Sequence, residues 1–364
     1  MSRGRADSSP GSPRVGPSAH RICTRIALAL LVGCESSAAP GILLNGKIAD
    51  TAPTPTVRAY FPAGRDPRLL FPLIELDPDH LSAGQVHEVL ATAPAPRIIL
   101  INGSVPVVTM GAFADYLIAM GYPRERLVDP HDGQLAQSSW TRSEELAGKL
   151  AWYYEHEAMM PILIGHSQGG MLVVRTLHEL AGAFRDAIEV WNPETDTSEH
   201  RTTIVDPYSG KERPVVGLVV GYSTALATGR LGRLLLGQWS MLGRLREIPD
   251  TAQDFTGFAI PGDLIAGNLF SDDPYVATGT AKVRNVTLPS SYSHIGLPQT
   301  AELAKTPRLR AWIDAYTPGT PLPPEGSDGE DATNLLHAAD IWFSVKRQWC
   351  LASQQLARAA LSRP

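Results

Sequence analysis

Residues 161–171, with the sequence PILIGHSQGGM, constrain the fold of this chain more than any other segment. The short apolar run 162–164 is followed by small residues around Ser167, and residues 171–180 then show apolar positions at helical spacing. This order predicts a strand, a tight turn and a helix. Glycines beside a tight turn allow backbone conformations that larger side chains forbid. We therefore expect Ser167 at a strained turn between a strand and a helix.

Strands and helices continue to alternate across residues 96–317. Apolar runs predict strands at residues 97–101, 126–129, 160–164, 215–222, 255–260 and 283–288. Helical periodicity predicts helices at residues 110–120, 141–156 and 299–316, the second of them capped by Thr141 with Glu144 three residues on. Such alternation is typical of an α/β fold, with a mostly parallel sheet covered by helices on both faces.

Different compositions flank this core. Residues 35–95 are rich in Ala and Pro, which predicts a tether and an N-terminal extension with weak strands at 56–61 and 69–74. Residues 318–364 predict a polar loop, followed by a helix from about residue 335 to residue 361.

Residues 1–34 have the pattern of an export signal. Five arginines without an acidic block precede a short apolar stretch at residues 26–32, and Leu-Val-Gly-Cys34 follows at its end. This ending resembles a bacterial lipobox, which predicts lipidation of Cys34 and attachment of an exported protein to a bacterial membrane. Two alternatives stay open: an ordinary cleaved signal peptide, and a disordered leader rich in Ser, Pro and Gly.

The bulk composition excludes several classes of function. The formal net charge is −5 and no basic block is interleaved with aromatic residues, which argues against nucleic-acid binding. Three scattered cysteines predict neither a disulfide framework nor a thiolate metal site. We expect no metal and no cofactor, and no protein partner is predicted.

Ser167 lies in the pattern Gly-x-Ser-x-Gly, which presents a nucleophilic serine when it joins a strand to a helix. Serine needs a base within hydrogen-bond reach and an acid that orients the base. In a parallel sheet such groups lie on loops after the carboxyl ends of strands. His294 follows the last predicted strand, and Asp263 follows the strand at 255–260. Asp272 and Asp273 are alternatives for the acid.

An oxyanion needs two backbone amides close to the nucleophile. The amide of Gln168 directly follows Ser167, and Ser104 lies in the turn after the strand at 97–101. Gly103 in that turn permits close approach of the backbone. We therefore predict Gln168 and Ser104 as the oxyanion-hole donors.

The segment 224–250 is a candidate cap over the substrate. Within residues 231–245, leucines and Trp239 recur at helical spacing, with glycines between them. As a cap, this segment would bring Leu235 and Trp239 to the substrate and favour an apolar acyl group. As the alternative, it would be a helix that covers the sheet.

The run Gly165-His-Ser-Gln-Gly-Gly170 and the order Ser167, Asp263, His294 resemble the lipase and esterase branches of the α/β-hydrolase family. The resemblance extends over about residues 95–317. It departs at Asn102-Gly103, where many members have His-Gly. The resemblance implies an exported hydrolase that cleaves a small-molecule or lipid carboxylic ester through an acyl-enzyme on Ser167. An amidase, a thioesterase or an acyltransferase would use the same groups, and a non-catalytic binding protein could share the fold.

Overall fold

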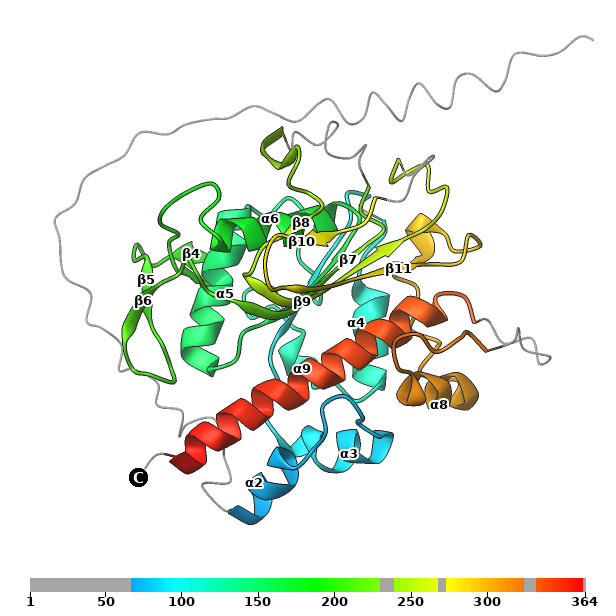
Figure 1. The fold of residues 1–364 in the computed structure, drawn as a ribbon, viewed down its shortest axis with the longest axis horizontal. Helices are drawn as coiled ribbons and strands as arrows, with labels where there is room; N and C mark the ends of the chain where they lie inside the picture. Colours follow the sequence, from blue (N-terminus) through cyan, green and yellow to red (C-terminus); the bar gives the residue numbers. More distant parts are fainter. Residues whose placement is uncertain (1–66, 106, 230–238, 268–272, 324–331, 363–364) are drawn as a thin grey trace, which may run out of the picture. The chain divides into compact units, whose positions relative to one another are not determined.

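The computed structural model describes residues 67–105, 107–229, 239–267, 273–323 and 332–362 (Figure 1). These residues belong to one compact unit. Within these ranges, no helix is both long and apolar enough to cross a membrane. The expected strand at 56–61, together with Cys34 and Leu235, lies outside the described residues.

A parallel sheet of five strands, in the order β1-β2-β7-β9-β11, lies at the centre of this unit. Its strands are β1 (Ile98–Ile101), β2 (Ile162–His166), β7 (Val220–Leu226), β9 (Ala252–Ala259) and β11 (Lys282–Thr287). The first three are buried along their whole length, as expected where helices cover both faces of a sheet. The α/β class and the largely parallel sheet are thus confirmed, although β7 begins further along the chain than expected.

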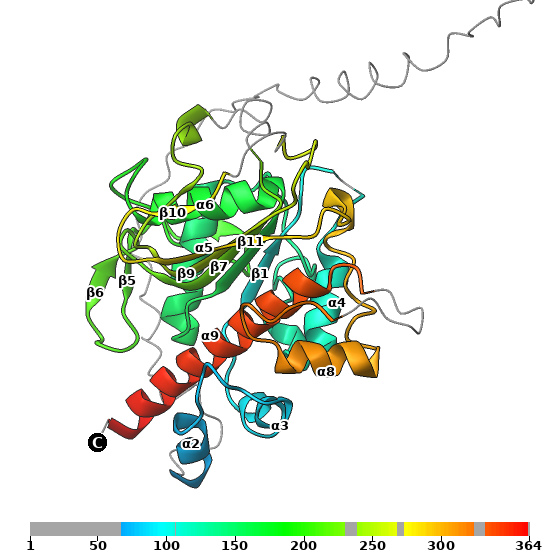
Figure 2. The same cartoon turned by 45° about the vertical axis from the view of Figure 1, so that its right-hand side comes forward.

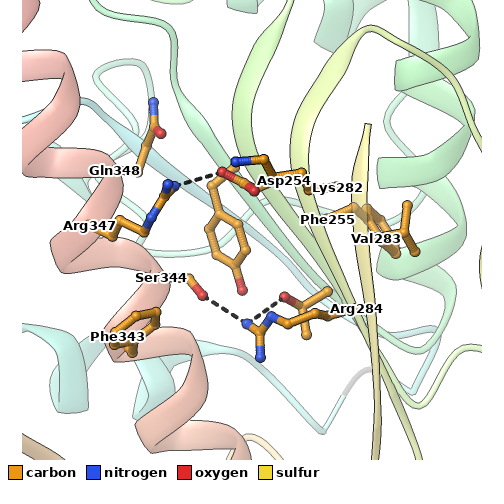
Figure 3. A pocket seen from close by; sticks show the side chains of 11 residues that line it. Asp254, Phe255, Lys282, Val283, Arg284, Phe343, Ser344, Arg347 and Gln348 are labelled. Carbon is orange, nitrogen blue, oxygen red and sulfur yellow. Dashed lines mark hydrogen bonds and ion pairs between the residues drawn. The ribbon is translucent and has the colours of Figure 1, made fainter. Parts of the chain in front are cut away.

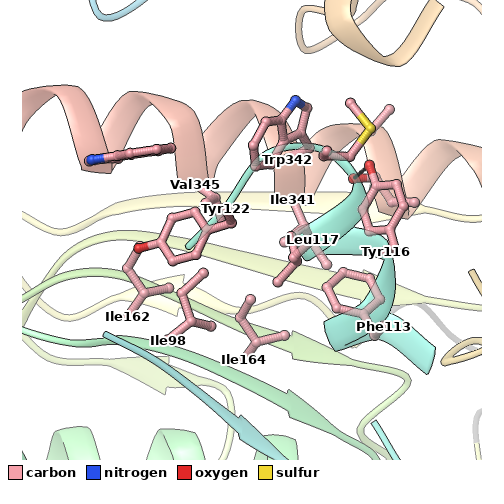
Figure 4. Packing of buried hydrophobic residues seen from close by; sticks show 14 of the residues in the cluster. Ile98, Phe113, Tyr116, Leu117, Tyr122, Ile162, Ile164, Ile341, Trp342 and Val345 are labelled. Carbon is pink, nitrogen blue, oxygen red and sulfur yellow. Dashed lines mark hydrogen bonds between the residues drawn. The ribbon is translucent and has the colours of Figure 1, made fainter. Parts of the chain in front are cut away.

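Helices cover the two faces of the sheet (Figures 1 and 2). They are α4 (Gly111–Ala119), α5 (Ser143–Glu157), α6 (Gln168–Leu180), α8 (Pro307–Ala315) and α9 (Leu335–Ser362). Side chains alternate between the faces of a strand, so neighbouring residues enter different cores. Ile98 and Ile162 pack in one core with α4 and α9 (Figure 4), whereas Ile99 and Leu163 pack in the other with α5 and α6.

The C-terminal helix α9 is 28 residues long and confirms the helix predicted there. Two of its own residues, Trp342 and Trp349, are fully buried. The helix packs against α8 and against α2 (Pro67–Ile74), near which lie α3 (Ala83–Glu88) and the short helix η2 (Leu90–Thr92). The N-terminal part of the described chain is therefore held on the sheet through α9.

Smaller elements complete the described unit. They are the short helices η3 (Arg124–Arg126), η4 (Trp239–Met241) and η5 (His294–Gly296), and the strands β3 (Trp191–Asn192), β4 (Thr197–Ser198), β5 (Thr203–Val205), β6 (Glu212–Pro214), β8 (Glu247–Ile248) and β10 (Val276–Ala277).

The strand expected at residues 69–74 is wrong, because this segment forms helix α2. Leu70 and Leu73, three residues apart, are buried in the core that contains α9, whereas Phe71 is exposed. A short apolar run fits either a strand or one face of a helix, and here packing against α9 decides.

Three further expectations also need correction. Residues 126–129 form no strand, because Gln137 takes the place beside β1 and exchanges main-chain hydrogen bonds with Leu100 and Asn102. The helix expected at 299–316 is reduced to α8, which begins at a proline. Thr141 does not cap α5, because the capping position is Arg142 and no side chain caps this helix end.

Candidate active site

Ser167 lies between the end of β2 and the start of α6 in a conformation that side chains rarely adopt, with φ 54° and ψ −116°. Close contacts explain why glycine stands on both sides of Ser167, at positions 165 and 169. A Cβ at Gly165 would collide with the main chain of Gly169, and a Cβ at Gly169 would lie 2.5 Å from the carbonyl oxygen of Ile101. The strand, the turn and the helix can therefore pack this closely only with glycine at both positions.

His294 and Asp263 reach Ser167 in a continuous hydrogen-bonded series. His294 Nε2 lies 2.9 Å from Ser167 Oγ, and His294 Nδ1 lies 2.7 Å from Asp263 Oδ2. A carboxylate accepts from Nδ1–H, which leaves Nε2 to accept the serine proton. The structure thus brings together the three residues that the sequence placed on separate loops.

Asp263 follows β9, and its second oxygen, Oδ1, accepts main-chain N–H groups from Ile265 and Ala266, both at 3.0 Å. Burial raises the pKa of this carboxyl group, but the hydrogen bonds from His294 and from the two amides outweigh burial and hold its pKa below the usual value. Asp263 is therefore a carboxylate at neutral pH, as an acid that orients a histidine must be.

The predicted oxyanion donors flank the nucleophile. Gln168 is the first residue of α6, and the first amides of a helix have no acceptor within the helix. The turn after β1 approaches from the other side, since a Cβ at Gly103 would lie 3.3 Å from Cβ of Ser167. Ser104 follows in this turn. The hydroxyl of Ser139 donates to the Gly103 carbonyl at 3.2 Å, which holds the turn in place.

The alternative acids and two other histidines do not replace these residues where the structure describes them. Asp273 pairs with Arg246 at 2.9 Å, and Asp272 lies outside the described residues. The His200 side chain is 84% exposed beside Glu189. His178 is buried on α6 and contacts the carbonyl oxygens of residues 244 and 247. Of these, the three that the structure describes, Asp273, His200 and His178, take no part in the hydrogen-bonded series at Ser167.

The candidate cap is described only in part. Trp239 begins the short helix η4 and its exposed fraction is 62%. Leu242 is exposed and Leu245 is buried. Residues 239–245 therefore do not continue the long helix expected over 231–245, and the contact of Trp239 with a substrate stays a prediction.

Sequence reasoning missed three buried polar residues behind the base. His166, His337 and Asn334 donate hydrogen bonds to main-chain carbonyl oxygens of the loop that contains His294. His166 is part of the serine motif, but the motif itself assigns no role to its side chain. The other two residues are 40 positions or so downstream, at the start of α9, and no local pattern connects them to the loop.

A cavity of about 340 Å³ lies away from this site, between α9 and the strands β9 and β11 (Figure 3). Two of its arginines are paired with carboxylates: Arg347 with Asp254 at 2.8 Å, and Arg284 with the fully buried Asp340 through two contacts of 2.6 and 2.7 Å. We interpret these pairs as structural links between α9 and the sheet. Among the described residues, no cluster of three or more His, Cys, Asp or Glu side chains could hold a metal ion.

Comparison with known proteins finds no family model and no curated protein that matches this chain.

Proposed function

We propose that this protein is a serine hydrolase of the α/β-hydrolase type that cleaves carboxylic esters through an acyl-enzyme on Ser167. The observation that carries the proposal is the series Ser167–His294–Asp263 on a strained turn. Serine hydroxyls are weak nucleophiles near neutral pH, and a base oriented by a carboxylate is the arrangement that activates them. The residue order and the strands that carry these groups also support it, since each follows a parallel strand of one sheet.

In the proposed reaction, Ser167 Oγ attacks the ester carbonyl carbon while His294 Nε2 takes the hydroxyl proton. The carbonyl oxygen becomes an oxyanion and accepts hydrogen bonds from the amides of Gln168 and Ser104. The C–O bond to the alcohol then breaks, and His294 returns the proton to the departing oxygen. Water repeats these steps on the acyl-enzyme and releases the acid.

The loops around Ser167 favour an apolar substrate. Exposed apolar side chains gather on loops after strand ends and beside the Gly103 turn: Val105, Val107, Trp140, Trp239, Leu242, Leu264, Ile265 and Ile295. Residues 103–111 contain no charged side chain, and residues 256–267 contain only Asp263. Uncharged apolar walls favour acyl or alcohol groups of similar character. We therefore propose an ester with an apolar acyl chain as the substrate class.

Turnover of p-nitrophenyl esters of graded chain length tests the proposal. Ser167→Ala should abolish turnover without unfolding the protein, because only a hydroxyl is removed. Ser209→Ala, in the turn between β5 and β6, is the matched control and should retain full activity. A folded Ser167→Ala variant with wild-type turnover would refute the serine-hydrolase proposal. If the protein turns over only the matched amides or only the matched thioesters, the substrate class is an amide or a thioester and not an ester.

A further inference from the structure

The loop that contains His294 is anchored from the side of the serine turn. His166 is 2% exposed, and its Nε2 lies 2.9 Å from the carbonyl oxygen of His294 itself. The same ring packs against the oxyanion turn, since a Cβ at Gly103 would come within 3.0 Å of its Nδ1. His166 therefore contacts both the base and the turn expected to hold the oxyanion.

The same loop is also anchored by Asn334, directly before α9, and by His337 in the first turn of α9. His337 Nε2 lies 2.9 Å from the carbonyl oxygen of Leu297. Asn334 Nδ2 donates to the carbonyl oxygens of Gly296 and Gln299 at 2.8 and 3.0 Å. The loop after β11 thus has four main-chain carbonyl groups held by side chains from two distant parts of the chain.

Both histidines are held in the neutral form. Burial, and then the nearby His294, lower the pKa of His166 to about 4, while burial lowers the pKa of His337 to about 3. The groups that face His166 are His294, Asp263 and His337, and His337 is otherwise surrounded by aromatic rings. A neutral imidazole has one N–H, and here the carbonyl contact assigns it to Nε2 in each ring.

We propose that Asn334, directly before α9, and His337, in its first turn, together with His166, are positioning residues for His294, so that the start of the C-terminal helix belongs to the catalytic apparatus. The inference rests on the proposed function. His294 begins the short helix η5, so the carbonyl groups anchored along this loop set where its main chain lies, and a misplacement of about 1 Å can lower a rate by about 100-fold. Fixed carbonyl groups hold the imidazole on the line between Ser167 and Asp263.

The key variants are His337→Leu and His337→Gln. Leucine removes the donor, whereas the amide nitrogen of glutamine reaches a position similar to Nε2 and restores it. His337→Leu should lower kcat by about 10- to 100-fold with KM changed less than about threefold. His337→Gln should recover most of kcat. A role in stability alone would move the melting temperature without this rescue of kcat.

Two further variants keep the test decisive if His337→Leu fails to fold. Asn334 has φ 70°, a backbone conformation that glycine adopts readily. Asn334→Gly therefore removes both donated hydrogen bonds without straining the backbone. This variant should also lower kcat. Gln354→Leu is the matched control: this buried residue of α9 donates to the carbonyl oxygens of Leu73, Ile74 and Leu76, far from the loop. It should lower the melting temperature and leave kcat unchanged.

The inference is overturned if folded His337→Leu and Asn334→Gly variants keep wild-type kcat. It is equally overturned if Gln354→Leu loses as much kcat as they do at a similar loss of stability. Failure of the proposed function has a different signature, since the wild-type protein would then show no ester turnover that Ser167→Ala abolishes.

Discussion

At the scale of single residues, the candidate site depends on where hydrogen-bond partners are fixed. Asp263 accepts one ring N–H and two main-chain N–H groups, so its orientation is set from three directions. Ser167 has its unusual φ because the strand, the turn and the helix leave no other path for the chain. These details follow from burial and packing, and in the proposed reaction they set the path of the proton from Ser167 to His294.

Asp263→Asn should lower kcat by about 10⁴-fold with little change in fold, because an amide no longer stabilises the His294 tautomer that accepts from Ser167. Ester turnover and thermal unfolding measured on the same preparation check this. Asp273→Asn is the matched control, since it breaks an ion pair with Arg246 outside the site and should affect stability alone. If Asp273→Asn loses most of its kcat while Asp263→Asn stays active, the acid that orients His294 is Asp273 and not Asp263.

At the scale of elements, the sequence predicted segments with one clear apolar pattern well and segments with an ambiguous pattern poorly. The strands β1 and β2 and the helix α9 were predicted because their apolar patterns are uninterrupted. The segment 69–74 was predicted as a strand because six apolar positions fit either period, and only packing on α9 selects the helix. The segment 126–129 failed because Gln137, which has no strand pattern, pairs with β1 instead.

Helix α9 should also make the stability of the protein depend on acid pH. His337 stays neutral in the folded protein down to a pKa of about 3, whereas an unfolded chain binds a proton near its ordinary value of 6.5. Between these values the unfolded state binds more protons, so the free energy of unfolding falls as pH is lowered.

His337→Gln should therefore flatten this dependence by up to about 1.4 kcal/mol per pH unit between roughly pH 6 and pH 4. Urea unfolding of both proteins at pH 8.5, 7.5, 5.5 and 4.5 measures it. Above pH 7 the two should show the same slope. Parallel slopes throughout the acid range would mean that His337 is not kept neutral by burial.

At the scale of the whole molecule, the three residues of the candidate triad could be predicted because each follows a parallel strand, and such ends meet at one edge of a sheet. The anchoring residues Asn334 and His337 could not, since they come from a helix beyond the predicted core and act through main-chain carbonyl groups. Trp239 and Leu235 were predicted from helical spacing, but the described part of that segment, from Trp239 onward, is not a long helix.

The apolar loops should set chain-length preference. Leu264 directly follows Asp263 in the loop after β9, and its side chain is 70% exposed. Leu264→Ser should therefore barely change the stability of the protein. It should lower kcat/KM for p-nitrophenyl decanoate by about 3- to 10-fold and leave the acetate unaffected. Phe71→Ser, an exposed apolar residue on α2, is the control and should change neither substrate. If the ratio of kcat/KM for the decanoate to kcat/KM for the acetate is unchanged in Leu264→Ser, this loop does not contact the acyl chain.

Cys34, which lies outside the described residues, should carry lipid when the chain is produced in a bacterial host. Cys34→Ser should then move the protein from the membrane fraction to the soluble fraction. Intact mass of the mature protein checks the modification. Cleavage at another position, or an unmodified Cys34, would contradict the lipid anchor.

The central claim is that Ser167 is an activated nucleophile, and site-resolved labelling tests it most directly. The wild-type protein is incubated with a fluorophosphonate, digested, and mapped by mass spectrometry. We predict one equivalent of label on Ser167, and no label on that peptide after heat denaturation before the reaction or in His294→Ala. A native protein that stays unlabelled, or label on a different serine, would contradict the account.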